Sequence, residues 1–242
     1  RADLDAAIDH AMQAVDLTLP GSPDRPTRLS NLAIWLADRW QLDGDRADLD
    51  AAIDHATQAV KLTLPDSPDR AGLLSNLAAL LAHRWGRDGD RADLDAAIDH
   101  AMQAVDLTPP GSPDRPTRLS NLAILLADRW GRDGDPGDLD AAIDHATQAV
   151  KLTRPASPNR ATLLGNLAGL LADRGQRGGN GQDVEAAVRL WRAALASAKD
   201  VSAVVWAAER VARVTLGTEQ WHVCAEAAEI AVRRVRELVG AF

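Results

Sequence analysis

The chain has 242 residues, of which 46% are hydrophobic and 26% charged, so it is long enough and apolar enough to fold around a buried core. Its formal net charge of -8 argues against nucleic acid or an anionic membrane as the main partner, because both attract basic surfaces. No apolar run approaches the roughly 20 residues of a membrane span. The single cysteine, Cys224, allows no internal disulfide bond and is typical of a reducing, cytoplasmic compartment.

Four copies of one motif indicate an internal repeat. DLDAAIDHA begins at Asp3, Asp48, Asp93 and Asp138, each time 45 residues further on. SPDR (once SPNR) and LSNLA (once LGNLA) recur with the same period, and DVEAAV at Asp183 is a fifth, diverged copy. Residues 1–40 and 91–130 differ at only two positions, so a repeated residue need not be functional, because duplication copies every residue alike.

Each repeat is predicted to form two helices. In the first, Leu74, Leu77 and Leu81 fall on one apolar stripe at helical spacing. We expect Gly86 to end this helix as a left-handed C-cap. The second helix is expected to begin with Asp93 as its N-cap and to end before Pro109. No segment has the pattern of a strand, so the predicted fold class is all-α.

The elements follow one another as a single array over residues 1–242. An unpaired helix is expected at 1–20, four repeats at 21–65, 66–110, 111–155 and 156–199, and a diverged helix pair at 200–242, which makes about 11 helices. A two-helix unit cannot bury its apolar stripe alone. Stacking of the repeats buries it, and the result is an α-solenoid with a concave and a convex side.

The stretch from Leu74 to Pro109 resembles a tetratricopeptide repeat (TPR). The resemblance rests on NLA and the following Leu81 in the first helix, and on Ala97, Ala101, Ala104 and Pro109 in the second. The combination SPDR…LSNLA…ADRW…DLDAAI is similar to the long repeats of kinesin light chains and of the arrays that precede CHAT domains, which are caspase-like proteases. The resemblance implies a right-handed α-solenoid whose first helices line the concave groove. A HEAT or armadillo array has a similar period but matches the NLA and Ala/Pro pattern less well.

No catalytic or metal-binding cluster is predicted. The recurring histidines are expected on the outer or edge surface, too far apart to share an ion, and they are His10, His55, His100 and His145. His222 and Cys224 lie two residues apart on a predicted helix and do not face each other as a catalytic dyad would, so Cys224 is expected to be a packing residue. We therefore expect no enzymatic activity, no cofactor and no metal.

Tryptophans and arginines are interpreted mainly as structural residues. Trp40, Trp85 and Trp130 are predicted to close the apolar stripe of the first helices, whereas Trp35 is either a packing variant or a surface anchor. The SPDR arginines are expected to cap helices or to form pairs between repeats, and they are Arg25, Arg70, Arg115 and Arg160. Asp38/Arg39 and Asp128/Arg129 are interpreted as solvated helix ends or ion pairs between repeats.

The candidate binding face is the non-core stripe of the first helices, which is small and polar with one apolar step. Its residues are Thr27, Ser30, Asn31, Ile34, Ser75, Asn76, His83, Thr117, Ser120, Asn121, Ile124 and Asn166. An asparagine amide both donates and accepts hydrogen bonds, which suits a peptide backbone, so a ladder of four could hold an extended segment. The resemblance to kinesin light chains implies the same use. The alternative is that each asparagine bonds a neighbouring helix and sets the stacking of the repeats.

The expected function is a non-enzymatic scaffold that binds a peptide or partner protein in the groove. Within a CHAT-type protein, it would be the sensing or recruiting arm. The alternative is a structural spacer or self-association module, because the helix over residues 3–18 lacks a preceding partner and would expose an apolar face at the end of the array. The start, RADLDAAIDH, has no signal peptide features and no initiator methionine, so we expect a piece of a longer protein.

Overall fold

The computed structural model describes residues 2–199, 201–202, 204–205, 208–209, 211–212 and 221–240. In these ranges the secondary structure is helical, which confirms the all-α prediction. The helices are α1 (Ala2–Asp16), α2 (Arg25–Asp43), α3 (Arg46–Leu62), α4 (Arg70–Asp88), α5 (Arg91–Asp106), α6 (Arg115–Asp133), α7 (Pro136–Leu152), α8 (Arg160–Gly178), α9 (Gly181–Ser197) and α11 (Trp221–Val239). The described residues between 201 and 212 are helical as well.

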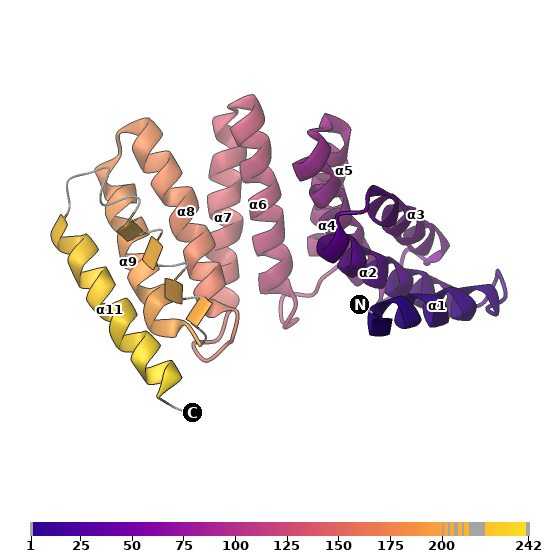
Figure 1. The fold of residues 1–242 in the computed structure, drawn as a ribbon. Helices are drawn as coiled ribbons and strands as arrows, with labels where there is room; N and C mark the ends of the chain where they lie inside the picture. The colour runs from indigo at the N-terminus through magenta and orange to yellow at the C-terminus, as the bar shows by residue number, and fades with distance from the viewer. Residues whose placement is uncertain are drawn as a thin grey trace. The chain divides into compact units, whose positions relative to one another are not determined.

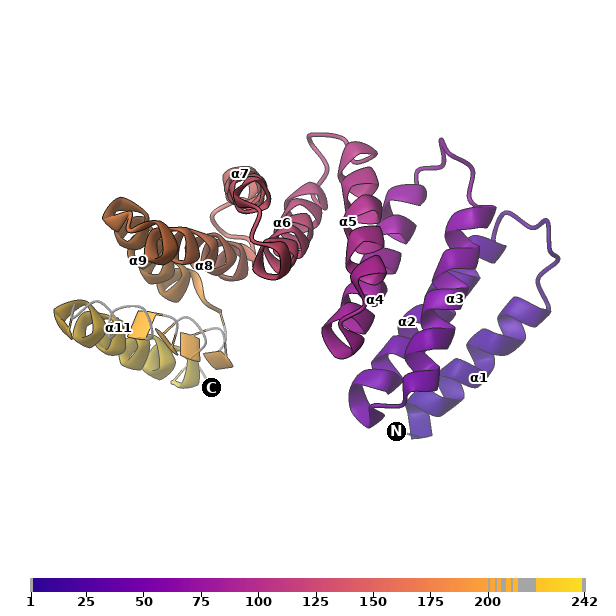
Figure 2. The same cartoon turned by 90° about the horizontal axis from the view of Figure 1, so that it is seen from above.

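The helices belong to two compact units, Arg1–Ser112 and Pro113–Phe242. In the first unit, α2 packs between α1 and α3, and α4 packs between α3 and α5 (Figure 1). In the second unit, α7 packs against α6 and α8, and α9 packs against α8 and α11, as Figure 2 shows from above. Successive first helices also touch, α2 with α4 and α6 with α8. Within each unit, this is the contact pattern of stacked helix-turn-helix repeats.

Leucines and alanines fill the core of each unit. In the first unit Leu49, Ala52 and Leu74 are completely buried, and the small alanines allow the helices to approach closely. In the second unit one buried cluster extends from Ala161 to Val211 and includes Trp191, which is 2% exposed. The stripes that were predicted from helical spacing are therefore the surfaces along which the helices pack.

A left-handed glycine ends each first helix, three residues later than predicted. Gly89 has φ +71°, and its N–H donates to the carbonyl of Trp85 at 2.7 Å. The equivalent glycines are Gly44, Gly134 and Gly179. The prediction that Gly86 ends the helix is wrong, because Gly86 lies inside α4. Both glycines allow a left-handed turn, but only Gly89 stands directly before Asp90, which caps the next helix.

The second helices begin with an aspartate or asparagine cap. The carboxylate of Asp90 accepts a hydrogen bond from the N–H of Ala92 at 2.9 Å. The equivalent caps of α3, α7 and α9 are Asp45, Asp135 and Asn180. The prediction that Asp93 is the N-cap is wrong. Asp93 lies in the first turn of α5, and it is only 6% exposed because it pairs with an arginine of the preceding helix.

This ion pair, which we call the Arg–Asp clasp, recurs in every repeat. Arg84 of α4 donates to both carboxylate oxygens of Asp93 at 2.7 Å. These hydrogen bonds raise the pKa of Arg84 above its ordinary value. The equivalent clasps are Arg39–Asp48, Arg129–Asp138 and Arg174–Asp183. A buried carboxylate requires such a bidentate partner, because removing a charge from water is costly unless the charge is paired.

The clasp arginines also reach back to the preceding repeat. Within the two units, Arg39 lies 3.2 Å from Asp5, Arg84 lies 3.5 Å from Asp50, and Arg174 lies 3.0 Å from Asp140. Each of these arginines therefore bridges two second helices from the first helix that lies between them. For Arg39 the predicted ion pair between repeats is confirmed.

The arginines of the SPDR motif cap the ends of second helices. Arg70 donates to the carbonyls of Val60 and Thr63 at 3.1 and 2.9 Å, and Arg25 makes the equivalent bonds to Val15 and Thr18. Arg160 donates to the carbonyl of Thr153. A cation at a helix C-terminus satisfies carbonyls that lack a partner within the helix. The predicted capping role is confirmed for these three arginines.

Two glycines, Gly86 and Gly89, provide a matched test of where α4 ends. We expect Gly89→Ala to lower the free energy of unfolding by about 1–2 kcal/mol, because an L-residue is strained at positive φ. A Cβ on Gly89 would meet no atom within 4 Å, so the cost comes from the backbone alone. Gly86→Ala should raise stability by about 0.5–1 kcal/mol, since alanine favours a helix interior. Urea unfolding measures both, and effects of the same sign would contradict this assignment.

The clasp in the last repeat predicts a pH-dependent stability. Its hydrogen bonds from Arg174 lower the pKa of Asp183 below the ordinary value. Because the folded-state pKa is lower than the unfolded one, the stabilisation is complete above the unfolded pKa of about 4 and is lost as pH falls through the folded pKa. We expect Asp183→Asn to destabilise the protein at pH 7 and progressively less below pH ~4.

Urea unfolding at several pH values checks this prediction. Asp140→Asn is the control, since Asp140 meets the same arginine with a side chain that is 64% exposed, and its effect should be small at every pH. A destabilisation by Asp183→Asn that did not change with pH would show that the carboxylate charge is not what matters.

Candidate functional site

The predicted binding face lies on α2 and α4 in the first unit and on α6 and α8 in the second. On α2, Thr27, Asn31 and Ile34 are exposed to solvent, and on α6 the equivalent Thr117, Asn121 and Ile124 are exposed as well. The two isoleucines are 41% and 43% exposed. Each unit therefore presents an apolar step that is flanked by polar side chains capable of hydrogen bonding.

Two of the four asparagines also join neighbouring first helices. The amide of Asn76 donates to the hydroxyl of Ser30 at 3.2 Å. Asn166 makes the same bond to Ser120 at 3.1 Å. Ser30 and Ser120 are 6% and 3% exposed, so they belong to the helix packing and not to the open face.

For Asn76 and Asn166, the structure shows the hydrogen bond to a neighbouring first helix that the alternative role in stacking requires. One amide N–H makes this bond, and an asparagine has a second N–H and a carbonyl oxygen in addition. Ser75, on α4, is half-buried. The ladder therefore divides into Asn31 and Asn121, which are exposed, and Asn76 and Asn166, which are half-buried and bonded to a serine of the neighbouring first helix.

Aromatic side chains extend the face in the first unit. His83 of α4 is exposed, and its ring centroid lies 5.2 Å from that of Trp40 on α2. Desolvation of the ring lowers the pKa of His83. Trp35 is 40% exposed, which favours the surface anchor over the packing variant.

The three tryptophans that were predicted to be core residues differ in burial. Trp130 is 7% exposed and carries the guanidinium of Arg177 at 4.1 Å from its ring centroid. Trp40 and Trp85 are only half-buried, so for them the prediction is too strong. The half-burial of Trp40 reflects its place at the edge of the stripe, where its ring meets His83.

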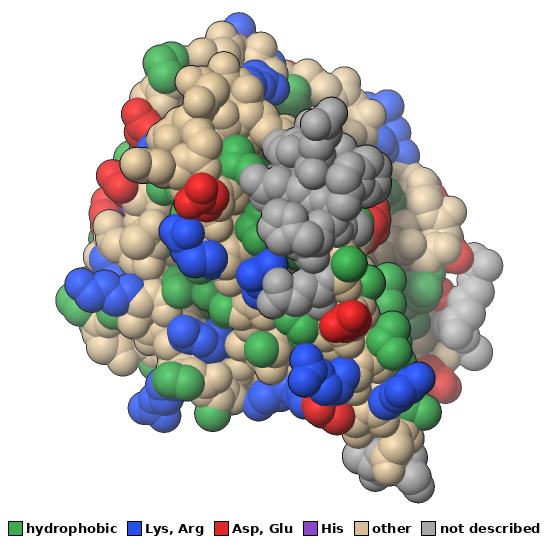
Figure 3. Space-filling model, turned by 90° about the vertical axis from the view of Figure 1, so that its left-hand side faces the viewer, with side chains coloured by type: hydrophobic (Ala, Val, Ile, Leu, Met, Phe, Trp, Pro, Cys, Tyr) green, Lys and Arg blue, Asp and Glu red, His purple; other side chains and the backbone are tan. Residues whose placement is uncertain are grey.

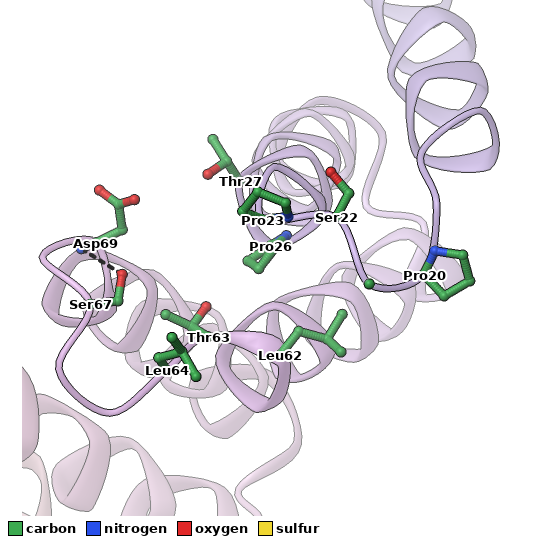
Figure 4. Close-up of a pocket in the computed structure, with 11 residues that line it drawn as sticks. Pro20, Ser22, Pro23, Pro26, Thr27, Leu62, Thr63, Leu64, Ser67 and Asp69 are labelled. Carbon is green, nitrogen blue, oxygen red and sulfur yellow. Dashed lines mark hydrogen bonds between the residues drawn. The ribbon is translucent and has the colours of Figure 1, made fainter.

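A cleft of about 360 Å³ opens in the first unit between the loop before α2 and the loop before α4 (Figure 4). Prolines line one wall, Leu62 and Leu64 line the other, and the prolines are Pro20, Pro23 and Pro26. Thr27 belongs both to this cleft and to the α2 face, so the two are continuous. The cleft was not predicted, because the prolines of these loops were interpreted only as helix ends. Its signal in the sequence is the leucine and proline that recur every 45 residues.

A second cleft, of about 660 Å³, lies in the second unit between α11 and the described residues from 204 to 212. Its walls are mainly valine and alanine, including Val205 and Val232, which are 57% and 52% exposed. Figure 3 views this end of the chain and shows hydrophobic side chains exposed among basic and acidic ones. This cleft contains none of the predicted site residues.

The histidines do not form a metal site in the structure. His10 is exposed, but His55, His100 and His145 are half-buried, at the edge of the helix packing and not on the outer surface. Burial lowers the pKa of His55 and His100. Among the described residues, no group of three His, Cys, Asp or Glu could hold an ion. The side chains of His222 and Cys224 lie outside the described residues.

None of the described helices combines the length and the apolar composition that crossing a bilayer requires.

Comparison with solved structures identifies the architecture. The crystal structure of BtubC (BKLC) from P. vanneervenii matches with a TM-score of 0.69 and 20% identity, over 99% of this chain and 93% of that one. A putative kinesin light chain from Podosopora anserina with nearly identical TPR-like repeats matches with a TM-score of 0.55 and 19% identity, over 78% of this chain and 87% of that one. The chain is a TPR-like repeat array.

MamA is a further structural neighbour of the TPR-like array, with a TM-score of 0.52 and 16% identity over 78% of this chain and 89% of that one. No family model matches the sequence, and no curated protein does. The resemblance to TPR arrays and to kinesin light chains is thus confirmed at the level of the fold.

The stacking role of Asn76 can be measured by a double-mutant cycle with Ser30. We expect a coupling of about 0.5–1.5 kcal/mol between Asn76→Ala and Ser30→Ala in the free energy of unfolding, because together they remove one hydrogen bond. The control combines Ser30→Ala with Asn166→Ala, whose partner is Ser120, and should show additive effects. A coupling near zero in the first cycle would mean that the amide does not bond the serine in solution.

Proposed function

We propose that this TPR-like array is a non-enzymatic scaffold that holds an extended peptide or a segment of a partner protein on its first helices. The observation that carries the proposal is the continuous surface in the first unit. It runs from the exposed Asn31 and Ile34 of α2, past Thr27, into the cleft between the two loops. Polar groups beside an apolar step and a cleft are the elements by which extended peptides are bound.

Each part of this surface has a distinct task in the proposed complex. The amide of Asn31 donates to and accepts from the peptide backbone, which gives affinity with little dependence on sequence. Ile34 and the leucines and prolines of the cleft take up apolar side chains, which adds specificity. Asp69 lies at the cleft and the chain has a net charge of -8, so a peptide with basic residues fits better than an acidic one.

The sequence resemblance to the arrays that precede CHAT domains supports one particular setting for this scaffold. In that setting the array is the sensing or recruiting arm of a caspase-like protease, and the bound segment belongs to a substrate or regulator. Co-purification of this chain with a CHAT-domain protease from its own cells tests that setting separately from peptide binding.

Peptide binding is tested with a random peptide library, followed by fluorescence anisotropy on the selected peptides. We expect Asn31→Ala and Ile34→Ser each to weaken binding by about tenfold, because each removes a hydrogen bond or an apolar contact worth on the order of 1 kcal/mol. Both side chains are exposed in the free protein, so the variants should keep the wild-type melting temperature.

The matched control is Gln58→Ala, which alters an exposed residue of α3 outside the face and should leave binding unchanged. Binding that survives both face variants would move the site elsewhere. A library that yields no binder would favour the alternative function, a structural spacer or self-association module.

A further inference from the structure

Helix α1 has almost the same sequence as α3 but a different environment. Residues 2–15 and 47–60 are identical except for methionine or threonine at positions 12 and 57. Helix α3 is packed on both sides, by α2 and by α4. Among the described helices, α1 packs only against α2. Differences in exposure between equivalent residues of α1 and α3 therefore show which residues of a second helix the preceding first helix covers.

Within the described residues, one face of α1 is more exposed than the same face of α3. On α3, four residues are 0–2% exposed, namely Leu49, Ala52, Ala56 and Ala59. Their counterparts on α1 are all partly exposed, namely Leu4, Ala7, Ala11 and Ala14. By contrast, Ile8 and Val15 are as buried on α1 as their counterparts are on α3. The difference is thus confined to the face that α2 covers on α3.

A charge at the edge of this face also lacks its counterpart. Asp48 on α3 is 6% exposed and accepts two hydrogen bonds from Arg39, each 2.7 Å long. The same clasp closes α5, α7 and α9. Asp3 occupies this position on α1, is exposed, and pairs with no side chain of the described residues.

We propose that this face of α1 is a docking site for one further helix of the first-helix type. The shape of the face requires leucines, and its charge requires an arginine that reaches Asp3. Both α2 and α4 show the pattern, leucines at i, i+3 and i+7 followed by arginine at i+10, as in Leu74, Leu77, Leu81 and Arg84. The proposed occupant is therefore an amphipathic helix with this pattern, from a further repeat of the same kind.

A second copy of the chain fits this site poorly. Its own α2 and α4 are already packed between two second helices, so neither can serve another copy without leaving both partners. The site is also separate from the peptide surface on α2, because it lies on the side of α1 that α2 does not cover. Its test is therefore independent of the peptide-binding test.

The first experiment titrates the full chain with a synthetic peptide of residues 67–90, whose Trp85 reports binding by fluorescence. We expect saturable one-to-one binding. Arg84→Ala in the peptide and Asp3→Ala in the chain should each weaken it at least about tenfold, since each breaks a bidentate charged pair. The two changes together should cost little more than either one alone.

A matched pair of variants locates the peptide on α1. Ala11→Arg places a charge on the uncovered face and should abolish binding. Gln13→Arg adds the same charge at a position whose counterpart Gln58 stays exposed on the fully covered α3, so it should leave binding intact. Asn31→Ala should also leave binding intact, which separates this result from any failure of the peptide groove.

Short helices are marginally stable alone, so a second measurement uses a fusion. Residues 66–90 joined directly before Arg1 reproduce the native sequence around residue 90, because 1–16 and 91–106 are identical. We expect a higher melting temperature and slower amide exchange in α1, both reduced by Arg84→Ala in the added segment. The proposal is overturned if neither the peptide nor the fusion protects α1. It is also overturned if the unmodified chain self-associates through this face in a manner that Ala11→Arg abolishes.

Discussion

The structure depends on one electrostatic constraint, the aspartate that α3, α5, α7 and α9 each bury in their first turn. A carboxylate at this depth is strongly destabilising unless both oxygens are paired, and the preceding first helix supplies the arginine that pairs them. The bidentate geometry fixes the rotation of the two helices against each other, since a guanidinium meets a carboxylate well only when the two groups are coplanar. The same arginine also pairs with an aspartate one repeat earlier. It therefore holds the two helices of its own repeat together and ties that repeat to the preceding one.

This constraint explains why the architecture could be predicted from the sequence more accurately than the residues that form the turns. Leucine and alanine stripes depend only on helical spacing, so the two-helix repeat and its packing faces can be recognised without coordinates. The segment GRDGD contains two glycines and two aspartates, and local propensity accepts several ways of dividing them between the helices. The choice is made by tertiary pairing. Once Asp93 is clasped by Arg84, Asp90 is left to cap α5 and Gly89 to make the turn.

The candidate site also combines features that the sequence predicts with features that only the tertiary structure reveals. Its exposed members, such as Asn31 and Ile34, can be found from the sequence because they lie off the core stripe of their helix. The hydrogen bonds of Asn76 and Asn166 cannot, because they depend on how closely neighbouring first helices approach. The loop cleft is likewise a product of stacking, since each loop contributes only one wall. Features that lie within one helix are thus readable from the sequence, and features shared between repeats require the structure.

Because the repeats are nearly identical, only a few positions of the proposed scaffold could distinguish one ligand from another. Residues that build clasps, caps and turns recur in every copy, so they cannot distinguish one ligand from another. Within the first unit, the face changes from Ile34 and Asp38 on α2 to Ala79 and His83 on α4. Trp35, whose counterpart on α4 is a leucine, is exposed beside Ile34. Ile34, Asp38, Ala79 and His83 are all exposed, so these differences alter the surface and leave the core packing unchanged. In the proposed scaffold, such positions would select the partner, because they can vary while the clasp that holds the stack stays intact.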